Sequence, residues 1–401
     1  MKQMRLITCV GFALSLLGAC TSDTSVSKAA TSATTGGAVG AVTTSKGTDP
    51  TTVPASSAPA QTSAAGTVEP AASVAPTAPE TTDTTPAIVA ATKAFLATLT
   101  DTERTAVSFD FSNTAQRQNW SNLPEGIYVR AGLMWGNLGE ASQNAWLKIM
   151  KTTLSQEGYD RVLAEQSADD ALAATDSGGG GGGGLKFGSQ YYWIAVIGTP
   201  SETEPWQWQW GGHHVTVNAT IVGSEISLTP SFIGVQPATY DANGNVVRPL
   251  GDIGDEAFAL VNSLDATQQG KAVLGGSLID LVLGPGQDGR TLAAEGLAGA
   301  DMTAEQQAAM LKLAGHYGGL LNAEDATARV AELQANLANT YFAWYGPTTA
   351  GNGMYFRISG PTIVVEYSGQ SMGGDTSNHI HGVYRDPTND YGAKLGAGIG
   401  G

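Results

Sequence analysis

The chain has 401 residues with 20 Lys or Arg against 36 Asp or Glu, which gives a formal net charge of −16 at pH 7. An acidic balance of this size argues against nucleic acid as a partner and against docking on anionic lipid by charge. The two cysteines, Cys9 and Cys20, both lie near the N-terminus. A fold built from the later residues therefore has no disulfide, no thiolate nucleophile and no sulfur ligand for a metal.

The N-terminus has the pattern of an export signal. Lys2 and Arg5 precede an apolar run over residues 6–17, which is about the length of a signal-peptide core and too short to cross a bilayer as a helix. The run ends in Leu-Gly-Ala-Cys at residues 17–20, which resembles the lipobox of bacterial lipoproteins. The alternative is an ordinary secretory signal with a coincidental cysteine. Small residues before the cysteine and polar low-complexity sequence after it favour a lipoprotein signal peptide over residues 1–19.

In a lipoprotein the cysteine thiol receives a diacylglycerol, and cleavage makes that cysteine the new N-terminus. We therefore expect lipid, with acyl chains such as palmitate, on Cys20. More than one acyl chain gives stable membrane attachment, because each buried methylene contributes about 0.8 kcal/mol. An Asp after the cysteine retains such proteins in the Gram-negative inner membrane, and Thr21 stands there instead. The expected location is outside the cytoplasm, at the outer membrane if the cell is Gram-negative.

The next segment is a predicted tether. Residues 21–86 are almost entirely Thr, Ser, Ala, Pro, Gly and Val, and no aromatic residue lies between Phe12 and Phe95. Such a segment cannot bury enough apolar area to offset its ordering entropy. We expect residues 20–86 to be disordered and residues 87–401 to form a single globular domain.

Helical and strand-like patterns are interleaved in the predicted domain. Segments with apolar residues at helical spacing are 88–99, 140–174 (as two helices broken near Gly158), 303–321 (with Thr303 as N-cap) and 323–345. Strand-like segments are 190–197, 206–222, 225–233, 354–359, 362–367 and 379–384. The order lacks the regular alternation of a doubly wound sheet. It predicts an α+β fold with a mostly antiparallel sheet and flanking helices.

Seven consecutive glycines at 178–184 invite comparison with a phosphate-binding loop. No Lys-Ser or Lys-Thr pair closes the run, and no strand leads cleanly into it. A flexible surface insertion is the better interpretation.

Four of the five histidines lie in two strand-like segments. His379 and His381 are two residues apart and so face the same side of a strand, and such a pair binds a metal when a third ligand arrives from elsewhere. Of the adjacent His213 and His214, only one can face a given side. We prefer His214 as the third ligand, because its face also carries the polar Asn218. His213 and Asn218 would then support the ligands or contact a substrate.

Glu366 is an acid at the end of an otherwise apolar strand, a setting that requires a cation or a hydrogen-bond network. It is the predicted fourth ligand, or a general base acting on metal-bound water. Two or three imidazoles with one carboxylate match a single Zn, Mn, Fe or Cu ion and do not suit Ca or Mg. The alternative is that the histidines are structural and hydrogen-bonded within a rigid sheet. The fifth, His316, is expected to cap a helix end.

Trp206, Trp208 and Trp210 share one face of an extended segment just before the first histidines. They form either an aromatic platform on which a sugar or an aromatic ligand stacks, or packing inside the sheet, which is the favoured alternative. A segment rich in turn-forming residues follows the second histidine pair. Its Arg385 or Asp386 could reach a bound anion or a ligating imidazole.

Several of these motifs occur in one characteristic order. They are Gly-Thr-Pro at 198–200, Gly-His-His at 212–214, Thr-Pro-Ser-Phe at 229–232, Phe-Ala-Trp at 342–344, Glu-Tyr at 366–367, His-Ile-His at 379–381 and Arg-Asp-Pro-Thr-Asn-Asp-Tyr-Gly at 385–392. Their order resembles the signature of domain-of-unknown-function family 3500, across most of residues 90–392. Members often continue past the final Tyr-Gly with a leucine-rich stretch ending in His, so a contact from such a tail is expected to be absent here. The resemblance supports the domain and implies no activity.

Two functions from different classes agree with the sequence. The first is an extracytoplasmic metal-dependent enzyme, a hydrolase or an oxidoreductase, acting on an unknown small-molecule or polymer substrate. The second is a non-catalytic surface-binding lipoprotein in which the tryptophans form the platform and the histidines are structural. An open coordination position on the metal favours the first, and four protein ligands that close the metal favour a structural site.

Overall fold

The computed structural model describes residues 84–175, 184–371 and 374–399. The predicted signal peptide, the predicted lipid site at Cys20 and nearly all of the predicted tether lie outside these residues, as does the glycine run except for Gly184. Within the described residues, no helix has both the length and the apolar character needed to cross a bilayer.

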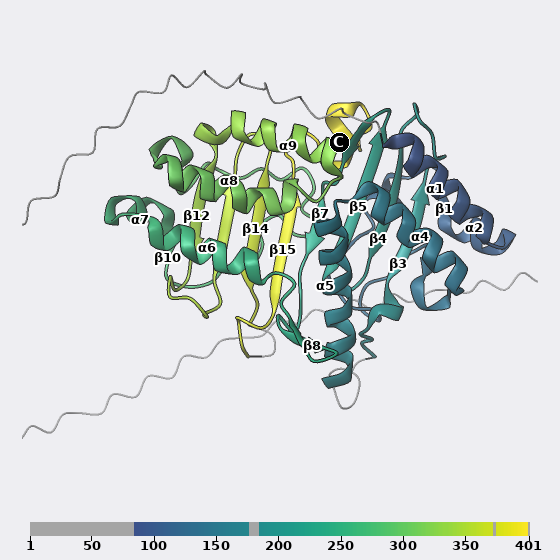
Figure 1. The fold of residues 1–401 in the computed structure, drawn as a ribbon, viewed down its shortest axis with the longest axis horizontal. Helices are drawn as coiled ribbons and strands as arrows, with labels where there is room; N and C mark the ends of the chain where they lie inside the picture. Colours follow the sequence, from purple (N-terminus) through teal and green to yellow (C-terminus); the bar gives the residue numbers. More distant parts are fainter. Residues whose placement is uncertain (1–83, 176–183, 372–373, 400–401) are drawn as a thin grey trace, which may run out of the picture. The chain divides into compact units, whose positions relative to one another are not determined.

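The described chain is organised by one 13-stranded sheet (Figure 1). Its strands are β1 (Ser108–Phe109), β2 (Leu133–Met134), β3 (Trp193–Ile197), β4 (Trp206–Gly211), β5 (Val215–Val222), β6 (Glu225–Ser227), β7 (Ser231–Ile233), β10 (Val273–Gly275), β11 (Leu297–Ala298), β12 (Tyr341–Tyr345), β13 (Tyr355–Ser359), β14 (Val364–Gly369) and β15 (Ile380–Arg385). A separate hairpin pairs β8 (Tyr240–Ala242) with β9 (Asn245–Val247).

The strand order along the large sheet is β1-β3-β4-β5-β7-β15-β14-β13-β12-β10, with β2 on β3, β6 on β5 and β11 on β12. Only the pairs β1–β3 and β10–β12 are parallel among the described strands. The prediction of an α+β fold with a mostly antiparallel sheet is therefore confirmed. The short strand β7 joins a group of strands from the first half of the chain to a group from the second half.

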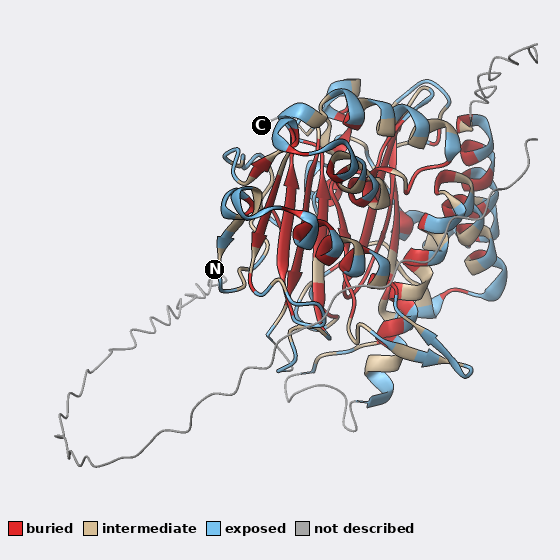
Figure 2. Cartoon of the chain, turned by 60° about the vertical axis from the view of Figure 1, so that its left-hand side comes forward, coloured by how far each residue is buried: buried red, intermediate tan, exposed pale blue. Residues whose placement is uncertain are grey.

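Helices flank the sheet. They are α1 (Thr85–Thr98), α2 (Asp101–Val107), α3 (Thr114–Arg117), α4 (Glu140–Thr153), α5 (Gln156–Thr175), α6 (Gly251–Ser263), α7 (Ala266–Ala272), α8 (Ala304–Gly318) and α9 (Ala323–Ala335). Figure 1 shows α4 and α5 over β3–β5, and α6 and α8 over β12–β15. The buried residues of these helices and strands form one hydrophobic cluster, and Figure 2 shows the strands buried along most of their length.

The three tryptophans of β4 lie inside this core. Trp206, Trp208 and Trp210 have no exposed surface, and Trp146 of α4 contacts Trp208 edge to face at 6.0 Å between ring centroids. Trp146 also packs edge to face against Phe95 of α1 at 5.1 Å. Buried rings offer no face to a ligand, so the idea of a stacking platform is wrong and the packing alternative holds.

Two helix boundaries differ from the sequence-based expectation. The break between α4 and α5 falls at Leu154 and Ser155, because the Ser155 amide bonds the Leu320 carbonyl at 2.9 Å. Gly158 lies inside α5, where a Cβ would come within 2.6 Å of that same carbonyl oxygen. Thr303 is the N-cap of α8 as expected, and its hydroxyl accepts a hydrogen bond from the Gln306 amide.

The helical pattern predicted over residues 323–345 covers two elements. Helix α9 ends at Ala335, and residues 341–345 form β12 between β13 and β10. The sequence of β12, Tyr-Phe-Ala-Trp-Tyr, consists mostly of aromatic residues, which favour strands over helices. Apolar residues at both helical and strand spacing made this short run ambiguous.

Candidate metal site

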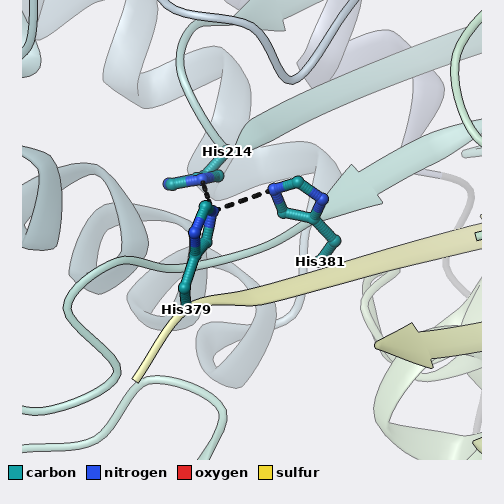
Figure 3. A group of neighbouring side chains, drawn as sticks. All are labelled: His214, His379 and His381. Atoms are coloured by element: carbon teal, nitrogen blue, oxygen red, sulfur yellow. Dashed lines mark hydrogen bonds between the residues drawn. The ribbon is translucent and has the colours of Figure 1, made fainter. Parts of the chain in front are cut away.

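Three of the predicted metal ligands converge where the strands in the middle of the sheet begin or end. His379 directly precedes β15, His381 lies within it, and His214 comes from the turn between β4 and β5. Nε2 of His379 lies 2.8 Å from Nε2 of His214 and 3.0 Å from Nε2 of His381 (Figure 3). Ligand nitrogens of the three rings all lie within 4.8 Å of one another.

This spacing suits a shared cation better than it suits hydrogen bonds alone. An imidazole nitrogen carries either one proton or one in-plane lone pair, so Nε2 of His379 cannot form two full hydrogen bonds to two other ring nitrogens. Nitrogens bound to one ion at about 2.0–2.1 Å lie roughly 3.0–3.4 Å apart, which is close to the observed separations. A cation accepts all three lone pairs at once.

The face on which His381 lies follows from strand alternation. Tyr384 of β15 packs toward helix α8 through Tyr317, whereas Val383 packs on the opposite face with Phe232 and Trp120. His381 is two residues from Val383 and therefore shares its face. His381 thus lies on the side of the sheet away from the α8 helix.

A strained turn positions His214. Its φ is +68°, a left-handed value that non-glycine residues rarely adopt. Three hydrogen bonds hold the turn: the Gly212 amide to the Val215 carbonyl, the Tyr192 hydroxyl to the His213 carbonyl, and Arg130 to the Gly212 carbonyl. The turn places the two adjacent imidazole rings 3.6 Å apart between centroids, instead of on opposite faces as a strand would.

A buried acid that the sequence-based reasoning missed supports this turn. Asp169 of α5 lies with Oδ1 2.6 Å from Nδ1 of His213, and both side chains are buried. Asp169, His213 and His214 also have ligand atoms within 4.8 Å of one another. The sequence offers one indication of it. Asp169 lies four residues after Glu165, so the two acids share one face of the helix, and both are buried.

The environment keeps the imidazoles of His214 and His381 neutral. Burial lowers the pKa of His214 well below its usual value, and the neighbouring His213, His381 and His379 lower it further. Burial, followed by the charges of His379 and His213, lowers the pKa of His381 to about 3. Neutral imidazole is the form that binds a metal ion.

Glu366 does not join the histidines, so its assignment as a ligand or general base is corrected here. Its carboxylate accepts hydrogen bonds from the amides of Val282 and Leu283 at 2.6 and 2.7 Å and from the Tyr355 hydroxyl at 2.8 Å. Among the described residues, Glu366 belongs to no group of metal-ligand spacing. The buried carboxylate is satisfied by a hydrogen-bond network, which was the alternative to a cation.

The other predicted supporting residues also have structural partners. Asn218 of β5 donates a hydrogen bond to the Pro230 carbonyl and accepts one from Gln209. The positive φ of His214 interrupts the strand alternation, so the predicted shared face of His214 and Asn218 is not formed. Arg385 binds Asp288, Asp390 and two loop carbonyls. Asp386 binds Arg329 and Thr388. These bonds join the chain end to neighbouring loops, and none of them reaches the histidines.

A third group of acids and a histidine is already neutralised in part by an arginine. Glu157, Asp252 and His316 have ligand atoms within 4.8 Å of one another. Arg161 binds both carboxylates, so a fixed positive charge already occupies the group. His316 lies in the last turn of α8 and contacts Glu256 of α6 at 3.0 Å, which links the two helices.

His381 opens onto a cavity of about 600 Å³. Only His381 of the three histidines is partly exposed, since 2% of His214 and 4% of His379 is accessible. Asn122 contacts two of the ligands: its carbonyl accepts the His214 amide, and its side-chain nitrogen lies 3.4 Å from Nε2 of His381. An ion held by the three histidines would therefore have an approach from solvent through one side.

Comparison with known families matches residues 81–393 to the family described as "Protein of unknown function (DUF3500)". The chain belongs to this family. The match includes every histidine of the candidate site and Asp169, and the family description carries no activity. No curated protein and no solved structure matches the chain.

Proposed function

We propose that this DUF3500 protein is a metal-dependent enzyme, a hydrolase or an oxidoreductase, that works outside the cytoplasm. One transition-metal ion is held by His214, His379 and His381. The observation that carries the proposal is the convergence of three imidazole nitrogens, 2.8 and 3.0 Å apart, beside a cavity. Imidazole ligands suit Zn, Mn, Fe or Cu.

The number of ligands favours catalysis over a structural role. Structural zinc sites are closed by four protein ligands, whereas catalytic sites keep a position open for water or substrate. Three histidines converge here, and among the described residues no carboxylate has this spacing to all three. Asp169, which has it to His214, is bound to Nδ1 of His213. An ion at this position would lower the pKa of a bound water or polarise a substrate that enters on the His381 side.

The location rests on the N-terminal sequence. The lipobox-like residues 17–20 and the polar segment that follows support lipid attachment at Cys20, and the membrane is then the partner of the anchored chain. Anchoring and metal chemistry are independent parts of the proposal, because the histidines lie far along the sequence from the anchor.

Metal analysis of the purified protein tests the proposal. We expect close to one transition-metal ion per chain, and we expect His379→Ala combined with His381→Ala to lose it while the circular dichroism of the fold is retained. His316→Ala is the matched control, because it removes an imidazole from the Glu157–Asp252 group and should leave the metal content unchanged. A wild-type protein that stays metal-free after incubation with each ion would instead favour a non-catalytic binding protein with structural histidines.

A further inference from the structure

The cavity beside His381 has walls rich in amide groups. Asn122 lies against the ring of His381, and Gln370, Gln287 and Gln118 also line the cavity. An amide side chain both donates and accepts hydrogen bonds, as a hydroxyl group does. A carboxylate or phosphate only accepts hydrogen bonds and is bound mainly by cations.

Apart from the proposed ion, the charges around the cavity do not favour an anionic ligand. No Lys or Arg side chain lines it, and its one charged lining residue is Asp280. The Asp280 carboxylate already accepts hydrogen bonds from the Leu281 amide at 2.7 Å and from Gln370 at 3.1 Å. The net charge of the chain, −16, adds a repulsive field for anions.

Aromatic and apolar surface completes the walls. Tyr128 is a partly exposed residue of the lining, and the buried Trp120 and Phe232 also line the cavity. An aromatic ring next to amide groups suits a ligand that has hydroxyl groups along its edges and C–H groups on its faces.

The backbone around the cavity disfavours an extended peptide. A peptide in strand conformation needs an unpaired strand edge. His381 lies on β15, which is paired on one side with β14 and on the other with β7. Phe232, also in the lining, lies on β7, which is paired with β15 and β5. The remaining lining comes from the segments 118–128 and 280–287 and from Gln370.

We infer that this cavity binds an uncharged polyhydroxylated ligand of the saccharide class, with one hydroxyl or linkage directed toward His381. The inference rests on the proposed function for the reacting end of the ligand and on the cavity lining for its chemical class. Tyr128 stacks on a sugar ring, and Gln370 and Asn122 bond its hydroxyls.

Saturation-transfer NMR and calorimetry with the metal-loaded full chain test the inference. The probes are the neutral hexasaccharides of β-linked glucose, α-linked glucose and β-linked N-acetylglucosamine, with oligogalacturonate as the anionic comparison and a neutral Gly-Ala peptide as the peptide comparison. We expect binding of at least one neutral saccharide. Tyr128→Ala and Gln370→Ala should each weaken it roughly fivefold to tenfold. Gln156→Ala, on the exposed side of α5, is the matched control and should not change it.

The outcomes separate this inference from the metal proposal. No binding of any neutral saccharide, tighter binding of the oligogalacturonate or the peptide, or saccharide binding that Tyr128→Ala and Gln370→Ala leave unchanged would each overturn the saccharide inference. Metal binding without saccharide binding would overturn the inference and leave the metal proposal standing. Saccharide binding with the expected variant effects by a protein that takes up no metal would support the inference and refute the metal proposal.

Discussion

Asp169 of helix α5 and His213 of the β4–β5 turn form a buried pair, with 2.6 Å between Oδ1 of the acid and Nδ1 of the ring. A carboxylate accepts hydrogen bonds, so Nδ1 of His213 is the donor. The His213 ring in turn lies against His214, one of the three proposed ligands. Helix α5 therefore supports the orientation of His214 indirectly, through the ring of His213.

Asp169→Ala should lower metal affinity by about tenfold or more, as loss of a supporting carboxylate does in other metal sites. Asp169→Asn keeps an oxygen acceptor for His213 and should restore much of the affinity. Competition with a chromophoric chelator measures both. Asp170→Ala is the control, because its carboxylate bonds the Ser189 amide instead. If Asp169→Ala and Asp170→Ala lower the metal affinity equally, the cause is a general disturbance of helix α5 and not the loss of the Asp169–His213 pair.

Glu366→Gln should destabilise the fold by about 1–3 kcal/mol and leave the metal content unchanged. The amide group of Gln would direct a donor toward the donating amides of Val282 and Leu283 or the Tyr355 hydroxyl, which leaves a buried donor unsatisfied. Urea unfolding gives the stability, and metal analysis of the same sample gives the occupancy. A variant of normal stability that loses its metal would restore Glu366 as a ligand.

Glu165 is a buried acid in an unfavourable setting on α5. It is 1% exposed, and although the Gly234 amide faces it, neither carboxyl oxygen has a hydrogen bond of normal geometry among the described residues. Burial raises its pKa well above the usual value, and Arg161 lowers it only in part. The titratable groups around it are Arg161, Asp252, Tyr192, Tyr240 and Tyr317.

A raised pKa in the folded state makes the contribution of Glu165 to stability greatest below about pH 4.5. The folded protein holds this proton more tightly than the unfolded chain, so the contribution is lost as the pH rises through the folded pKa, at about 1.4 kcal/mol per unit. Glu165→Gln cannot titrate, so its stability should not fall with pH for this reason. Urea unfolding in the presence of chelator at about pH 5 and about pH 8 should show a smaller decline for the variant than for the wild type. Parallel declines would mean that Glu165 titrates normally.

Cys20→Ser should abolish lipid attachment and leave the protein in the aqueous phase when a detergent solution is separated, as precursor or as misplaced product. The reason is that the lipobox cysteine is the only acceptor that the signal pattern provides. Cys9→Ser, inside the predicted signal, is the matched control and should remain in the detergent phase. A mature-size Cys20→Ser product in the detergent phase would contradict the anchor.

The sequence predicts what depends on local periodicity. His379 and His381 share a face because strand alternation has a period of two, and the helices α1 and α8 begin close to their expected residues for similar local reasons. The tryptophans of β4 share a face as expected, and their burial depends on α4, which covers that face. Whether a given face of a strand is buried depends on what packs against it, and alternation alone does not predict this.

The rest of the candidate site depends on contacts between distant segments. The left-handed residue of the β4–β5 turn is His214 and not a glycine, so the sequence does not mark the point at which the alternation argument for Asn218 fails. The partners of Glu366 are backbone amides at residues 282 and 283, and a backbone donor leaves no mark in the sequence. Asp169 precedes its partner His213 by 44 positions and lies in a helix, so no strand pattern includes it.

A narrow junction between two groups of strands lies next to the candidate metal site. Strand β7 has three residues and pairs through Ser231 and Phe232 with β15 and through Phe232 and Ile233 with β5. His214 lies in the turn between β4 and β5 on one side of this junction, while His379 and His381 belong to β15 and the residue before it on the other side. A bound ion would therefore cross-link the two strand groups, so the metal-loaded protein should unfold in one cooperative step. Removing the ion should let the two groups separate at different denaturant concentrations, so that occupancy of the metal site would set how cooperatively the whole sheet unfolds.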